Sequence, residues 1–108
     1  MKRGDFVTVA LQGEAGKPRP ALIVQSDRFD RHATVTVLPL TSTAVDAPLF
    51  RIPVEPDTDN GLQQTSHVMV DKIVTVRREK VGPAFGAASD ALMQAVNRAL
   101  VLFLSIAR

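Results

Sequence analysis

Near its N-terminus the chain reads Lys17-Pro18-Arg19-Pro20-Ala21-Leu22-Ile23-Val24. The last four residues form a continuous apolar run, which predicts a short strand buried on both faces. Pro18 and Pro20 restrict the backbone on both sides of Arg19. A restricted backbone lowers the entropic cost of holding a guanidinium in one place, which favours phosphate binding by Arg19. The alternative is a loop arginine that stays in water.

Strand patterns continue outward from this segment through the first two thirds of the chain. Apolar side chains alternate in residues 6–11, 34–38 and 51–55, and a longer strand-like segment spans residues 66–76. Pro39 directly follows one of these strands and has no N–H to donate. We therefore expect that strand to lie at a sheet edge or to carry a bulge there.

The pattern changes to a helical period at the end of the chain. Ser89 is a candidate N-cap for one helix over residues 90–106. Its apolar stripe is Leu92, Val96, Leu100 and Phe103, widened by Met93 and Leu104. Strands followed by a single helix predict an α+β fold, mostly β, with a largely antiparallel sheet. The 108 residues fit a single domain, residues 1–108, and a core this small favours a homodimer.

Composition excludes several classes of site. The absence of Cys removes disulfides, thiolate metal sites and cysteine nucleophiles. His32 and His67 are far apart, and no glycine-rich phosphate loop occurs, so we expect neither a metal nor a cofactor. No signal sequence and no apolar stretch of about 20 residues is found, which predicts a cytoplasmic protein without a membrane partner. A net charge of +2 permits a nucleic-acid partner.

Taken in order, these segments resemble the MazF/PemK family of toxins from bacterial toxin–antitoxin pairs. The segments that carry the resemblance are residues 3–7, 17–25, 37–42, 60–62 and 66–76 and the helix from Asp90. The resemblance covers nearly the whole chain. It implies a small SH3-like barrel of the CcdB/MazF type with a C-terminal helix, usually as a homodimer. It also implies a metal-independent, sequence-specific endoribonuclease that cleaves single-stranded RNA and is inhibited by a cognate antitoxin.

The resemblance also implies roles for individual residues. Arg19 and Thr41 match the catalytic positions: Arg19 neutralises charge on the phosphate, and Thr41 donates a hydrogen bond to a phosphate oxygen. The general base matches Asp71 or Glu14. In the alternative interpretation, Asp71 pairs with a nearby arginine and Glu14 is solvated in its loop. Some relatives carry an arginine two residues before the strand aspartate, where this chain has Met69.

RNA contacts are expected from polar and basic side chains near these positions. Lys17, Arg77 and Arg78 are candidates for contacts with the RNA backbone, and Ser42 for a hydrogen bond to the substrate. The chain has no Trp or Tyr, so base stacking depends on arginine planes or on one exposed Phe. We expect Phe50 to be that residue and the other four Phe to lie mostly in the core.

Two other functions are compatible with the same fold. A CcdB-like poison of DNA gyrase uses a C-terminal helix with an exposed Trp, whereas this chain ends Leu104-Ser105-Ile106-Ala107-Arg108 and has no Trp. A non-catalytic barrel that only binds RNA or protein is the third interpretation. Substitution of Arg19 distinguishes a nuclease from a gyrase poison. A nuclease should lose its toxicity in Arg19→Ala while still binding RNA, whereas a gyrase poison should not respond to the change.

Overall fold

The computed structural model describes residues 1–11 and 17–106. Its strands are β1 (Asp5–Ala10), β2 (Pro18–Ile23), β3 (Thr34–Thr41), β4 (Arg51–Val54), β5 (Ser66–Met69), β6 (Val74–Arg77) and β7 (Val81–Ala87). Three short 3-10 helices, η1 (Asp27–Phe29), η2 (Val70–Lys72) and η3 (Arg78–Lys80), join strands, and α1 (Asp90–Phe103) follows β7. None of the described helices is long and apolar enough to cross a membrane.

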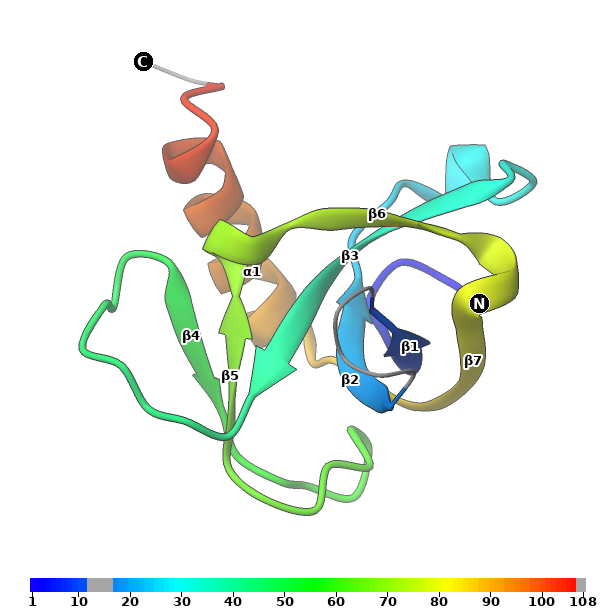
Figure 1. Ribbon diagram of the computed structural model, residues 1–108. Coiled ribbons are helices and arrows are strands. Elements are labelled where there is room, and N and C mark those ends of the chain that lie inside the picture. Colours follow the sequence, from blue (N-terminus) through cyan, green and yellow to red (C-terminus); the bar gives the residue numbers. More distant parts are fainter. Residues whose placement is uncertain (12–16, 107–108) are drawn as a thin grey trace.

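The strands form one curved sheet in which all recorded pairs are antiparallel. The strand order is β4-β5-β3-β2-β1-β7, and β6 also pairs with β3. Figure 1 shows β3 running between the β4–β5 pair on one side and the β1, β2 and β7 strands on the other. The predicted α+β class and the open, barrel-like antiparallel sheet with a C-terminal helix are confirmed.

β3 organises the sheet because it changes partner along its length. Residues 34–37 pair with β6, whereas Leu40 and Thr41 pair with β5. Pro39 lies in the gap between these two ladders, and on the other side it is the register partner of Ala21 in β2. The expectation of an edge strand or a bulge is therefore wrong. A residue without an N–H is accepted in a central strand because the strand changes partner there.

Two other expectations are corrected at the C-terminal part of the sheet. The segment 66–76 is two strands, β5 and β6, separated by η2, so that its halves pair with opposite ends of β3. β7 was not expected, because its sequence VGPAFGA has little apolar alternation. β7 forms through its pairing with β1, which has two register irregularities.

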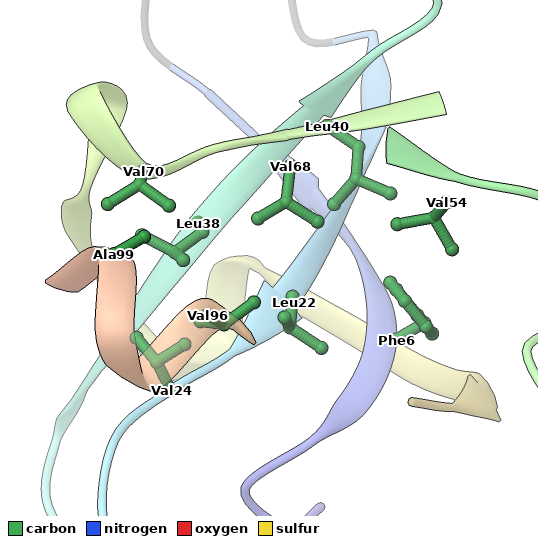
Figure 2. Close-up of a cluster of buried hydrophobic side chains, with 10 residues drawn as sticks. All are labelled: Phe6, Leu22, Val24, Leu38, Leu40, Val54, Val68, Val70, Val96 and Ala99. Atoms are coloured by element: carbon green, nitrogen blue, oxygen red, sulfur yellow. The ribbon is translucent and has the colours of Figure 1, made fainter. Parts of the chain in front are cut away.

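The larger core cluster lies between α1 and the sheet (Figure 2). Val96 is fully buried there and Ala99 nearly so, packed with residues such as Phe6, Leu22 and Val68. Burying Val96 contributes about 1.5–3 kcal/mol. The helix begins as expected, since the hydroxyl of Ser89 accepts a hydrogen bond from the backbone N–H of Leu92.

The C-terminal end of α1 differs from the expectation of a core stripe. The helix ends at Phe103 rather than at residue 106, and Phe103 is 45% exposed. Phe29 and Phe85 are also exposed, whereas Phe50 is partly buried and its ring lies 6.1 Å from that of Phe103. Phe6 is the only phenylalanine in the buried core, so the expected distribution of these rings is largely wrong.

Candidate active site

Arg19 and Thr41 are brought together by the pairing of β2 with β3. The register pairs Ala21 with Pro39. Arg19 and Thr41 each lie two residues beyond this pair, at the end of the β2–β3 ladder, and the two-residue period places them on the faces of Ala21 and Pro39. Figure 1 shows the start of β2 and the arrowhead of β3 at the same end of the sheet. Residues 22 positions apart in the sequence thus lie at the same end of the sheet.

A cleft of about 360 Å³ opens at this end of the sheet. Its lining includes Arg19, Thr41 and Ser42, together with Pro20, Pro39, Gln64, Ser66 and Met69. The Thr41 hydroxyl oxygen accepts a hydrogen bond from the backbone N–H of Thr43 at 3.1 Å. Because a hydroxyl also carries one proton, Thr41 can still donate a hydrogen bond to a bound anion. The cleft therefore combines a guanidinium with the hydroxyl-bearing residues Thr41, Ser42, Thr43 and Ser66.

The other predicted RNA contacts lie outside this lining. Lys17 is exposed, two residues before Arg19. Arg77 is the register partner of Thr34, seven residues from Thr41 along β3 and therefore about 23 Å away. Its guanidinium pairs with Glu79 at 2.8 Å, and Arg78 donates to the backbone carbonyl of His32. The structure does not bring these two arginines to the cleft.

The structure describes only one of the two candidate general bases, Asp71. Glu14 lies outside the described residues. Asp71 is bound by Arg51, whose Nε and Nη2 donate to its two carboxylate oxygens at 2.7 and 2.9 Å. These hydrogen bonds hold the pKa of Asp71 below its ordinary value, against the opposing effect of burial, and raise the pKa of Arg51. A carboxylate held in this way is a weak proton acceptor, and Asp71 does not line the cleft.

The arginine that pairs with Asp71 lies on a different strand from the arginine that some relatives carry two residues before this aspartate. Arg51 on β4 is the register partner of Met69 on β5. The guanidinium therefore reaches Asp71 across the β4–β5 ladder rather than from two residues earlier in the chain. The alternative interpretation, in which Asp71 pairs with a nearby arginine, is therefore confirmed. Sequence reasoning could not identify Arg51 as that arginine, because the register between two strands joined by residues 55–65 is not visible in either strand.

Several cleft residues were missed by sequence reasoning. Gln64, Ser66 and Met69 reach the cleft from β5 and the connection before it. His67 is the register partner of Thr41, and its Nδ1 is buried without a hydrogen-bond partner among the described residues. The one available signal was the polar run Gln63-Gln64-Thr65 after the Asn60-Gly61 turn. In the described part of the chain, no three His, Asp or Glu side chains are grouped so as to hold a metal ion.

Comparison with known proteins agrees with this fold. Residues 2–104 match the family described as PemK-like, MazF-like toxin of type II toxin-antitoxin system. The chain belongs to this family of toxins. It is 47% identical to a probable endoribonuclease MazF of Mycolicibacterium smegmatis, with 99% of each chain covered. It is also 29% identical to endoribonuclease MazF9 of Mycobacterium tuberculosis, with 98% of each covered.

Solved structures show the same similarity. An endoribonuclease in complex with its cognate antitoxin, from a mycobacterial species, superimposes with a TM-score of 0.82 at 28% identity. That match covers 100% of this chain and 98% of the other. The Mycobacterium tuberculosis toxin MazF-mt6 superimposes with a TM-score of 0.80 at 26% identity, covering 94% of this chain and 96% of the other.

Proposed function

We propose that this chain is an endoribonuclease toxin that cuts single-stranded RNA at specific sequences. The observation that carries the proposal is the cleft where β2 begins and β3 ends, which is lined by both Arg19 and Thr41 and so holds a guanidinium and a hydroxyl together. The relatives named as endoribonucleases, which match along almost their whole length, support the same reaction class.

The proposed chemistry uses the nucleophile that RNA itself carries. The 2′-oxygen attacks the adjacent phosphorus, and the bond from phosphorus to the 5′-oxygen breaks. The proton of the 2′-OH passes to a base, and the 5′-oxygen gains a proton, so the products are a 2′,3′-cyclic phosphate and a 5′-OH end. Because the 2′-OH is the nucleophile, the reaction as proposed requires no metal-bound water.

The cleft residues fit the charge requirements of this reaction. The two-pronged guanidinium of Arg19 matches the non-bridging oxygens of a phosphate, on which negative charge grows in the transition state. The hydroxyl of Thr41 donates to one of the same oxygens. Lys17 and Ser42 contact the RNA on either side of this pair. Cleavage therefore depends on positioning and charge neutralisation by β2 and β3.

For the proton acceptor we propose Glu14 rather than Asp71. The Asp71 carboxylate receives two hydrogen bonds from Arg51 and lies outside the cleft lining. Glu14 is three residues after Leu11, which lines the cleft, and five residues before Arg19. Asp71 then serves to hold β4 against η2 through Arg51.

The proposal includes a second copy of the chain and a cognate antitoxin. The end of α1 and the loop before β4 expose apolar side chains, among them Leu49 at 66%, Leu102 at 59% and Ile106 at 69%. A patch of this kind is typical of a subunit interface. The structure of a related endoribonuclease with its cognate antitoxin supports an antitoxin partner here. An acidic or apolar tail that fills the RNA cleft would inhibit cleavage.

RNA cleavage in EDTA tests the function directly. Purified protein, free of antitoxin, is incubated with a long RNA of mixed sequence, and both ends of each fragment are identified. We expect discrete cuts with 5′-OH ends. Arg19→Ala is expected to reduce cleavage by about 100- to 1000-fold, as for the loss of one transition-state donor. Arg31→Ala, which removes the same charge from an exposed loop at the other end of β3, is the matched control.

Two results would contradict the proposal. The first is equal cleavage by wild type and Arg19→Ala, which would mean that the cleft does not hold the scissile phosphate. The second is the absence of cleavage by folded wild-type protein, which would instead favour gyrase inhibition or RNA binding without catalysis. Retained RNA binding by Arg19→Ala would separate loss of catalysis from loss of the substrate.

A further inference from the structure

A second hollow of about 380 Å³ adjoins the cleft that contains Arg19 and Thr41. The two share Pro20, Gln64 and Ser66 in their linings, so they lie side by side. No charged side chain among the described residues lines the second hollow. A strand of RNA whose phosphate binds in the first part would therefore find an uncharged surface in the second.

Phe85 on β7 provides an aromatic surface in this hollow. Its side chain lines the hollow and the residue is 39% exposed. The Phe85 ring also stacks on the buried ring of Phe6, with centroids 6.2 Å apart and planes inclined by 24°. Support from a core residue fixes the plane of the exposed ring, so little entropy is lost when a flat ligand stacks on it.

The connection from β4 to β5 also lines the hollow, and it is held in place. Asn60 is only 2% exposed; its side-chain oxygen accepts from the N–H of Leu62 at 2.9 Å, and its amide donates to the carbonyl of Glu55 at 2.8 Å. Gly61 has a φ of +68°, and a Cβ there would collide with the backbone of Phe85. This close approach requires glycine. The hollow is thus preformed rather than created by a moving loop.

Two amides complete the set of groups that a nucleobase needs. The side chains of Gln63 and Gln64 line the hollow next to Phe85. Single-stranded bases are bound by stacking on aromatic rings and by hydrogen bonds to their edges, and a glutamine amide can both donate and accept. Phosphate, by contrast, has no cationic partner here. The shape and polarity of the hollow, and its position next to the cleft, therefore fit a nucleobase better than a phosphate.

We propose that this hollow is a nucleobase subsite of the RNA groove, in which a base near the scissile phosphate stacks on Phe85 while Gln64 contacts its edge. The inference rests on the proposed ribonuclease function and adds to it a determinant of sequence preference. It also replaces Phe50, which packs near Phe103, as the stacking residue.

The test combines a protein change with a matching change in the RNA. A short RNA that contains the mapped cleavage sequence is prepared intact and with an abasic nucleotide at each position in turn. We expect Phe85→Ala to lower kcat/KM on the intact RNA by about 10- to 100-fold, the usual cost of losing one base–aromatic stack. At one RNA position, an abasic nucleotide is expected to lower the kcat/KM of the wild type by a similar factor. The same abasic RNA should lower the kcat/KM of Phe85→Ala little further. Phe29→Ala, which removes an exposed ring from η1, is the matched control.

A second variant addresses the packing role of Phe85 against Phe6. Gln64 is exposed, so Gln64→Ala leaves the core intact. It is expected to relax the base preference at the same RNA position without changing thermal stability. The subsite is overturned if abasic nucleotides lower kcat/KM by the same factor in Phe85→Ala and wild type at every position. It is also overturned if both variants weaken only antitoxin binding. In either case the proposed ribonuclease activity stands. A wild-type protein that cuts no RNA overturns both proposals.

Discussion

The ion pair between Arg51 and Asp71 should stabilise the fold rather than take part in proton transfer, and Asp71→Asn tests this. The side chains are only 12% and 18% exposed and form a two-pronged contact with hydrogen bonds of 2.7 and 2.9 Å. Exposed pairs contribute about 0–1 kcal/mol. Removing one partner of a fully buried pair costs about 3–5 kcal/mol. This pair lies between those limits, so we expect a loss of about 2 kcal/mol, or a fall in Tm of roughly 10 °C.

The pH dependence of stability provides the sharper part of this test. Because Arg51 lowers the pKa of Asp71 in the folded protein, the pair contributes fully above the unfolded pKa of about 3.9. That contribution is lost as the pH falls through the lower, folded pKa. Urea unfolding of wild type and Asp71→Asn should therefore differ most at neutral pH, and the difference should shrink in acid.

The control uses a second ion pair of the same charge type. Arg77 and Glu79 are 2.8 Å apart, but their side chains are 73% and 62% exposed. Glu79→Gln should leave the unfolding free energy unchanged within error. The reasoning is refuted if Asp71→Asn is as stable as wild type at neutral pH yet has lost cleavage more than about 100-fold, the size of effect expected for a general base. Asp71 would then be the proton acceptor.

Three further predictions concern the cleft and the apolar end of α1. Thr41→Val should lower kcat/KM by about 10- to 100-fold with little change in Tm, because it removes one hydrogen bond to the phosphate; equal rates would exclude Thr41 from the reaction. Glu14→Gln should reduce the single-turnover cleavage rate constant at saturating enzyme by about 100- to 10,000-fold with little change in the enzyme concentration that half-saturates this rate, and full activity would rule out the proposed base. Leu102→Asp should shift the protein from dimer to monomer in sedimentation velocity, since it places a charge in an apolar patch; an unchanged mass would remove that face from the interface.

Local patterns were sufficient to predict most strands, the helix and two residues that line the cleft, Arg19 and Thr41. Arg19 stands out because two prolines flank it and an apolar strand follows, and Thr41 because it ends a strand after a proline. The helix could be predicted from Ser89 onward because a cap and an apolar period of 3.6 residues both depend on neighbouring positions. Each of these features is contained within a few consecutive residues.

Other features depend on which strand lies beside which. β7 is a strand because β1 pairs with it, although its own sequence contains two glycines and a proline. Pro39 is accepted in a central strand because β3 changes partner there. The alternation of apolar side chains over residues 66–76 predicts strands but does not reveal the turn at η2. The reason is that the two-residue period of the side chains is unchanged when a strand changes partner.

For this protein, the sequence alone determined the order of most strands and the helix, the family resemblance, and the selection of Arg19 and Thr41 as candidate catalytic residues. Only the tertiary structure decided that Arg51 binds Asp71, that Arg77 and Arg78 lie away from the cleft, and that Phe85 rather than Phe50 lines the adjoining hollow. The physical reason is that these contacts join residues from different strands. Strand register arises when the whole sheet buries its core, and no short stretch of sequence carries it.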